Sequence, residues 1–131
     1  MRVFLRVSLV LALLVAATSC SGKRTNITGT ITRDGKPLEW KSEGGHLLVI
    51  FVPVPRRENQ DPYLAETDRE AGTYRIDEIR AGRYMVAIHQ FDERHGDSLA
   101  NKYDPVHTPL IVEVEEDGQV IDIDLPKDLP Q

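Results

Sequence analysis

Residues 73–91 read TYRIDEIRAGRYMVAIHQF, which is two runs of strand length separated by a short turn. In the first run, 73–79, apolar and polar residues alternate, as they do in a strand with one buried face. Arg80-Ala81-Gly82 forms the turn, and the second run, 83–91, is rich in β-branched and aromatic residues. The segment therefore predicts two strands that follow each other through a tight turn.

Further strands are predicted before this pair. Residues 26–33, NITGTITR, alternate in the same way, and Asp34-Gly35 after them supplies the positive φ angles of a tight turn. Residues 46–52, HLLVIFV, form a continuous apolar run, which predicts a central strand covered on both faces. Residues 63–67, YLAET, predict a weaker strand.

The C-terminal part predicts a hairpin. LIVEVE, 110–115, and VIDIDL, 120–125, are joined by the turn EDGQ. The side chains expected to face the core are those of Leu110, Val112, Val114, Ile121, Ile123 and Leu125. About seven short strands and no amphipathic helix after the N-terminal segment predict one all-β domain, an antiparallel Greek-key β-sandwich.

Two segments resemble the signatures of carboxypeptidase-regulatory-like, transthyretin-like (prealbumin-like) domains. GTITRDGKPLE, 29–39, is similar to their first strand and turn, Gly-x-Val-x-x-x-Gly-x-Pro-Leu. ETDREAGTYRIDEIRAGRYMVAI, 66–88, is similar to their second signature, with matches at Thr67, Asp68, Gly72, Tyr74, Gly82 and Tyr84. Ala81 replaces the common proline, and one extra residue precedes Gly72. The resemblance implies a transthyretin-like sandwich that serves as a non-catalytic module. The enzyme branch of the group, the hydroxyisourate hydrolases, ends in Tyr-Arg-Gly-Ser, whereas this chain ends in DLPKDLPQ.

The first nineteen residues have the pattern of a bacterial export signal. Arg2 and Arg6 precede an apolar run at 7–17, and small residues follow it. This run is shorter than the roughly 20 residues that a membrane-spanning helix needs. We therefore expect residues 1–19 to be a signal-peptide helix that is cleaved.

Cys20 is the only cysteine, so no intramolecular disulfide can form. Ala17-Thr18-Ser19-Cys20 resembles a bacterial lipobox, in which the residue after the cleavage site carries lipid. We expect residues 20–25 to be a lipidated cysteine and tether, and residues 26–131 to be the domain. Ordinary cleavage after Ala17 or Ser19, leaving a soluble secreted domain, is the alternative. The build of this chain, a signal segment followed by one such domain, resembles that of small lipoproteins in planctomycete-type bacteria.

Charge and motifs narrow the function classes. The net charge of −5 lacks the basic footprint of a nucleic-acid-binding protein, and no cofactor motif is present. The expected partners are the membrane, through lipid on Cys20, and envelope proteins or wall polymers. Ser42 and Ser98 do not lie in a Gly-x-Ser-x-Gly turn, so nucleophilic catalysis has no support.

Residues 92–109 form the only long stretch without a strand pattern, and they hold most of the side chains able to bind a metal ion. Carboxylates and imidazoles together bind divalent cations, and the candidates are His89, Asp92, His95, Asp97, Asp104 and His107. Their spacing matches no known metal motif. The prediction is a solvated polar loop without a metal, and His89 is expected to be partly buried or at an edge.

Aromatic side chains on a sandwich bind sugars or peptides when they are exposed, and the candidates are Trp40, Tyr63 and Tyr103. For Trp40 the favoured interpretation is a cap on one end of the core, because tryptophan is usually substantially buried. The predicted function is a non-catalytic interaction or structural module in the cell envelope. The alternatives are a glycan- or peptide-binding module and a metal-binding or enzymatic domain that uses residues 92–109.

Overall fold

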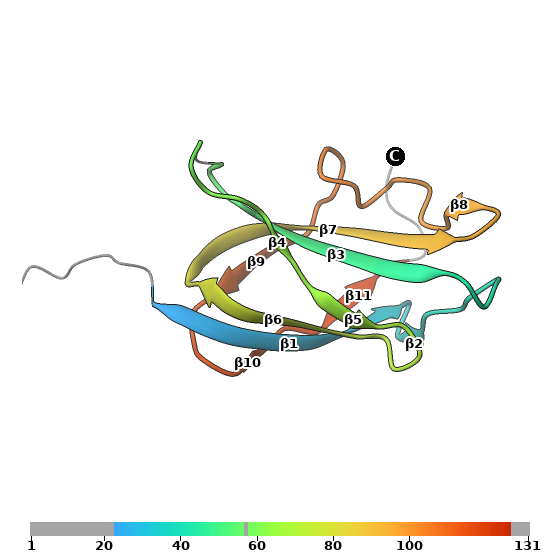
Figure 1. Cartoon of the computed structure of the whole chain (residues 1–131), viewed down its shortest axis with the longest axis horizontal. Coiled ribbons are helices and arrows are strands. Elements are labelled where there is room, and N and C mark those ends of the chain that lie inside the picture. Colours follow the sequence, from blue (N-terminus) through green and yellow to red (C-terminus); the bar gives the residue numbers. More distant parts are fainter. Residues whose placement is uncertain (1–22, 57, 127–131) are drawn as a thin grey trace, which may run out of the picture.

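The computed structural model describes residues 23–56 and 58–126, which form two β-sheets packed face to face (Figure 1). The predicted all-β sandwich is therefore confirmed. The predicted export signal and Cys20 lie outside the described residues. In the described part of the chain, no helix has the length and apolarity needed to cross a membrane.

The first sheet is built around β1 (Arg24–Arg33). On one side β1 pairs antiparallel with β6 (Thr73–Arg80), which pairs in turn with β5 (Glu66–Asp68). On its other side β1 pairs parallel with β10 (Gln119–Val120) and β11 (Ile123–Leu125). The short β2 (Lys36–Pro37) folds back on the end of β1. Ten consecutive residues of β1 therefore run from one end of the molecule to the other.

The second sheet is built around β7 (Gly82–Asp92). It pairs antiparallel with β3 (His46–Pro53) on one side, and with β8 (Gly96–Asp97) and β9 (Ile111–Val114) on the other. β4 (Tyr63–Leu64) extends the sheet beyond β3. The two runs at 73–79 and 83–91 are indeed successive strands, but β6 and β7 lie in different sheets.

The prediction of a C-terminal hairpin is wrong. β9 belongs to the second sheet, whereas β10 and β11 belong to the first. The Gln119 side chain closes the loop between them, accepting from the Glu115 amide (2.8 Å) and donating to the Glu113 carbonyl (3.0 Å). After this loop, Asp122 accepts from the Thr30 amide (2.9 Å) and thereby fixes the chain beside β1.

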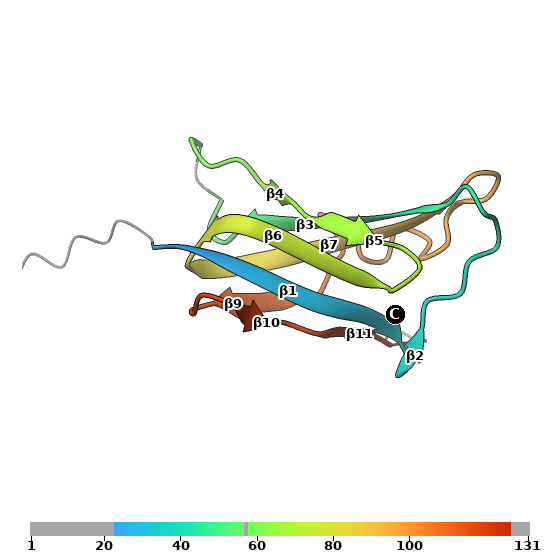
Figure 2. The same ribbon diagram turned by 60° about the horizontal axis from the view of Figure 1, so that its bottom comes forward.

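The weak strand predicted at 63–67 is two strands in two sheets. β4 pairs with β3, β5 pairs with β6, and the chain passes between the sheets at Ala65 (Figure 2). Ala65 is buried, and its amide donates to the Val49 carbonyl (2.9 Å). This short segment therefore joins the two layers at one side of the sandwich.

The prediction that strand 46–52 is covered on both faces is also wrong. Leu47, Val49 and Phe51 point into the core between the sheets. Leu48 and Ile50 lie on the outer face and are only partly buried. A continuous apolar run is consistent with burial of both faces, but here the second face is on the surface.

Aromatic residues fill the centre of the core. Phe51 contacts Tyr74 and Tyr84, with ring centroids 5.8 and 6.0 Å apart. The Tyr74 hydroxyl donates to the Ile121 carbonyl (2.5 Å), and the Tyr84 hydroxyl donates to the Arg80 carbonyl (2.6 Å). Burial, and then the neighbouring Tyr63, raises the pKa of Tyr84 to about 12. Both phenols thus keep their protons and tie strand ends to the core.

The predicted turn at Asp34-Gly35 is confirmed. Asp34 and Gly35 adopt φ angles of 54° and 72°, as a two-residue turn with left-handed backbone requires. Asp68 accepts hydrogen bonds from the amides of Glu70 (3.0 Å) and Ala71 (3.2 Å), so its side chain caps the turn between β5 and β6.

Candidate functional site

A groove of about 410 Å³ lies at the end of the sandwich where β1 finishes. This end carries β2 and β8 and is opposite the start of β1 (Figure 1). The groove is lined by Arg33, Asp34, Lys36, Pro37, Glu39, Trp40, Lys41, Gln90 and Ser98. Its volume lies in the range typical of ligand-binding clefts. We therefore take this groove as the candidate site.

Trp40 forms the aromatic part of the groove wall. It is partly buried and packs against the hydrophobic core, as the interpretation of a core cap expects. Gly45 lies against its ring, so close that a Cβ on Gly45 would be 2.8 Å from the Trp40 Cε3 atom. The Arg69 guanidinium lies 4.5 Å from the ring centroid. The indole is thus held between a backbone and a cation.

The indole nitrogen of Trp40 lacks a partner. Within residues 23–56 and 58–126, Trp40 Nε1 is the one buried side-chain nitrogen or oxygen without a hydrogen bond. Buried polar groups in folded proteins almost always have a partner, and an exception calls for a physical explanation. Because this nitrogen is covered, a ligand in the groove would supply an acceptor only if the Trp40 loop shifts on binding.

Arg69 fixes the loop that carries Trp40. Its guanidinium donates to the carbonyl oxygens of Ser42 (2.8 Å), Glu43 and Gly45 (2.8 Å). A guanidinium has five donors in one plane, so it can bind several carbonyls at once while it stacks on the indole. Arg69 therefore positions one wall of the groove from the turn after β5.

Asp92 fixes the base of the same loop. It is 3 % exposed and accepts hydrogen bonds from the Lys41 amide (3.2 Å) and from the hydroxyls of Ser42 (3.3 Å) and Ser98. The bond from Ser98 is the main cause that lowers the pKa of Asp92; those from Lys41 and Ser42 add to it, while desolvation opposes it. The buried carboxylate therefore holds the end of β7, the Trp40 loop and Ser98 together.

The open rim of the groove carries charges of both signs. Arg33, Lys36 and Lys41 are positive, whereas Asp34 and Glu39 are negative. On the inner side, the buried Gln90 donates from Nε2 to the Glu39 carbonyl (2.6 Å). Such a rim offers both donors and acceptors to a polar ligand.

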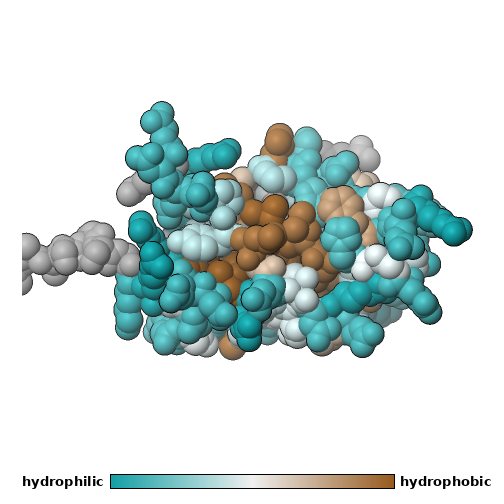
Figure 3. Space-filling view, in the orientation of Figure 1, coloured by the Kyte–Doolittle hydropathy of each residue, from teal (hydrophilic) through white to brown (hydrophobic). Residues whose placement is uncertain are grey.

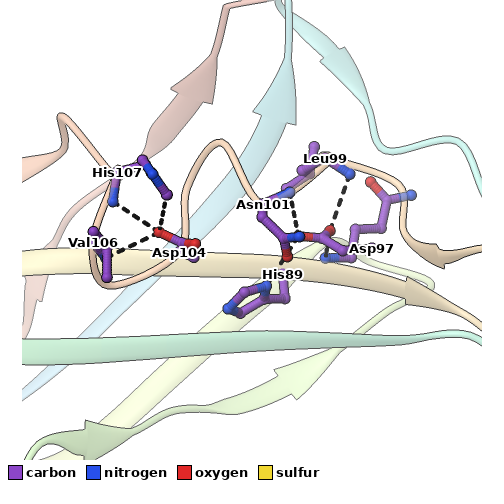
Figure 4. Close-up of polar contacts among 8 residues, drawn as sticks. His89, Asp97, Leu99, Asn101, Asp104, Val106 and His107 are labelled. Atoms are coloured by element: carbon purple, nitrogen blue, oxygen red, sulfur yellow. Dashed lines mark hydrogen bonds and ion pairs between the residues drawn. The ribbon is translucent and has the colours of Figure 1, made fainter.

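The metal candidates of segment 92–109 are arranged as separate pairs rather than as one cluster. His89 Nδ1 lies 2.9 Å from Asp97 Oδ2, and the same carboxylate accepts from the amides of Gln90, Leu99 and Asn101 (Figure 4). Asp97 thus organises the turn after β8. His89 is partly buried, as predicted, with a side chain 12 % exposed.

The second pair is Asp104 and His107, farther along the same segment (Figure 4). Asp104 accepts from His107 Nδ1 (2.8 Å) and from the amides of His107 (2.8 Å) and Val106 (2.9 Å). Desolvation raises the pKa of Asp104, but these hydrogen bonds outweigh it and leave the pKa below its ordinary value. His95 is exposed, and its amide donates to the Asp92 carbonyl (3.2 Å).

The described residues contain no group of three or more His, Cys, Asp or Glu side chains that could hold a metal ion. The expectation of a wholly solvated loop is wrong in one respect, because Asp92 and Asp97 are buried. Each of these carboxylates accepts backbone hydrogen bonds, so the acidic residues of this segment fix its conformation.

Two of the three aromatic candidates are outside the groove. Tyr103 is 2 % exposed in the core, and its hydroxyl donates to the Pro126 carbonyl (3.3 Å), so it offers no ring to a ligand. Tyr63 is partly buried against Tyr84, with ring centroids 5.9 Å apart. Trp40 alone of the three lines the groove.

Sequence reasoning missed the roles of Arg69 and Gln90. Arg69 lies in the turn between β5 and β6, but its contact with residues 42–45 crosses between the sheets and has no local signal. Gln90 is a polar residue at an inward position of an apolar strand, and this pattern could have indicated a buried polar contact. No model of a known protein family matches the chain, and no curated protein matches it either.

Proposed function

We propose that this protein is a non-catalytic, lipid-anchored module of the bacterial cell envelope that binds an extended wall polymer in the Trp40 groove. The observation that carries the proposal is a groove that has the Trp40 side chain in its wall and charges of both signs on its rim, next to a buried indole N–H that lacks a partner. Peptides and glycans both present acceptor oxygens together with apolar faces. A groove that combines an aromatic ring with several polar groups suits such ligands.

The position of the groove supports an anchored role. β1 begins at Arg24, four residues after Cys20, and the groove lies at the other end of this strand. Four extended residues reach at most about 14 Å. A lipid on Cys20 would therefore keep the start of β1 close to the bilayer, and the groove would face away from it.

A catalytic role lacks support in the side-chain geometry. The hydroxyls of Ser42 and Ser98 both donate to Asp92, and His89 and His107 each face a carboxylate. A serine or threonine nucleophile is activated by a base within hydrogen-bond reach of its hydroxyl. In the described part of the chain, neither imidazole is hydrogen-bonded to a hydroxyl.

Intact mass of the protein purified from membranes tests the anchor. We expect a mature chain that begins at Cys20 and carries the added mass of its acyl chains, because two or more chains give stable membrane attachment. A Cys20→Ser variant should be released from the membrane fraction. An unmodified chain that begins at Thr18 or Cys20 would contradict the anchor and support the secreted alternative.

Calorimetric titration with soluble peptidoglycan fragments tests the groove. These fragments carry sugars and a peptide, and we expect saturable binding to the full-length protein. Trp40→Phe keeps an aromatic ring but removes the N–H donor, so affinity should fall about tenfold, as one lost hydrogen bond implies.

The matched control is Tyr63→Phe, which removes a hydroxyl outside the groove and should leave the affinity unchanged. Chito-oligosaccharides and a stem peptide, titrated separately, distinguish the glycan from the peptide part of the ligand. Absence of binding by all three probes, or equal binding by Trp40→Phe, would overturn the assignment of the groove.

A further inference from the structure

The two outer faces of the sandwich differ sharply in chemistry. In the first sheet, strand register brings polar side chains together on the outside: Thr28, Thr30, Glu66, Asp68, Thr73 and Arg75. In the second sheet, the same argument brings His46, His89 and Phe91 together at the end near β8. The rest of this face is apolar: Leu48, Ile50, Val52, Leu64, Met85, Ala87 and Ile111. We call this apolar set the aliphatic face. The outer face of the first sheet is thus mostly polar, with Val120 exposed at its edge.

The aliphatic face reaches the surface. At its two edges Leu64 is 65 % exposed and Ile111 is 45 % exposed, while Ala87 between them is fully covered by its neighbours. Figure 3 shows a hydrophobic area at the centre of the molecule, over β3 and β4. An antiparallel sheet that faces water is normally polar on that side. A contiguous apolar area indicates an interaction surface.

The shape of this face favours a flat partner. No residue of the aliphatic face lines the Trp40 groove, or the shallow groove beside Thr28 on the first sheet. Leucine, isoleucine and methionine side chains that stand on a sheet pack well against another sheet about 10 Å away. The core of this protein is built in that way, so a second sheet face of like composition would be a suitable partner.

We propose that two copies of this chain pack against each other through the aliphatic face. Beside Met85 and Ile111, Arg83 on β7 and Glu113 on β9 form an ion pair (3.9 Å), and both side chains are more than half exposed. One cation next to one anion is self-complementary, because a two-fold axis can bring each charge opposite its counterpart in the other copy. A partner surface with charges of only one sign could pair with only one of these two residues.

The size of the face sets the expected strength. This outer face is built from β3, β4, β7 and β9, which have 8, 2, 11 and 4 residues. With about 3.3 Å per residue along a strand and about 4.8 Å between strands, it presents at most about 400 Å² per copy. A dimer would then bury at most about 800 Å², the size of a weak, transient contact. We therefore expect a dimer that dissociates reversibly on dilution.

Sedimentation equilibrium of the full-length protein in detergent tests the dimer. The wild type should shift from monomer to dimer as concentration rises into the hundreds of micromolar. In a Leu64→Lys/Ile111→Lys variant, each copy would bury two lysine charges in the dimer contact. The dissociation constant should therefore rise at least about 100-fold. These two residues are the most exposed of the face, so the unfolding midpoint should be retained.

A variant of the other outer face, Thr28→Lys/Thr73→Lys, is the matched control and should dimerise like the wild type. Because detergent could cover an apolar face, a thiol-reactive bifunctional crosslinker is also applied to intact membranes. We expect Met85→Cys to give a crosslinked dimer and Thr28→Cys to give none. A monomeric wild type, unchanged association of the Leu64/Ile111 variant, or equal crosslinking at both cysteines would overturn the proposal.

Discussion

Gly29→Ala should lower the free energy of unfolding by about 3 kcal/mol, near the upper end of overpacking effects. A Cβ on Gly29 would lie 1.9 Å from the Ile121 carbonyl oxygen and 2.6 Å from Tyr74 Cε1. The chain before β11 would have to move away from β1. That movement would break the hydrogen bond between the Tyr74 hydroxyl and Ile121 and the one from the Ile121 amide to the Thr28 carbonyl (2.8 Å).

Urea unfolding followed by the fluorescence of Trp40, the single tryptophan, measures this loss. Gly118→Asn is the control, because a Cβ there has no atom within 4 Å and asparagine tolerates the φ angle of 74°. We expect this control to lose less than about 1 kcal/mol. A Gly29→Ala protein as stable as the control would contradict the close crossing of β1 and the chain at Ile121.

Asp92→Ala should also cost about 3 kcal/mol of unfolding free energy, because it leaves buried donors without an acceptor. The Lys41 amide and the hydroxyls of Ser42 and Ser98 all donate to this carboxylate. Loss of these bonds should release the Trp40 loop, so acrylamide should quench Trp40 more strongly in the folded variant. Arg94→Ala, at an exposed position two residues later, is the control and should change neither quantity measurably.

The contribution of Asp92 should depend on pH in a defined direction. Its pKa in the folded protein lies below the ordinary 3.8, so the unfolded chain takes up the proton more readily. The carboxylate therefore stabilises the fold above about pH 4, and this contribution is lost as the pH falls further below that value. The stability difference between the wild type and Asp92→Asn should be largest near neutral pH and should shrink in acid.

This comparison isolates Asp92 from the other acidic groups. Asp104 and Asp124 also have lowered pKa values, and both are present in the wild type and in Asp92→Asn. Their acid-dependent losses therefore cancel in the difference. A difference that stays constant from pH 7 to pH 3 would contradict the role assigned to the Asp92 carboxylate.

Sequence reasoning identified the strands because their signals are local. Alternation in 73–79 and 26–33 and the turn at Asp34-Gly35 depend on neighbouring residues, and all are found in the structure. The pairing of β10 and β11 with β1 is different. It depends on Asp122 and Asp124 accepting hydrogen bonds from residues about ninety positions earlier. Two adjacent alternating runs joined by a turn look the same whether they form a hairpin or enter different sheets.

The candidate site was predictable in part. Trp40 is conspicuous as the single tryptophan, and its packing on the core follows from its size. Its contact with Arg69, and the unpartnered indole nitrogen, arise from the tertiary arrangement of two separate loops, 38–45 and 69–72. The run at 46–52 carries a similar ambiguity, because composition cannot distinguish a strand buried on both faces from one with an apolar surface.

The position of β1 has a mechanical consequence. A lipid on Cys20 and a polymer in the Trp40 groove would apply force at opposite ends of this strand, along its length. The hydrogen bonds from β1 to β6, β10 and β11 lie across that direction. Tension would therefore load them together in shear rather than opening them one at a time. If the proposed anchor and ligand are both present, such an arrangement would let this small domain transmit force between a membrane and a wall without unfolding readily.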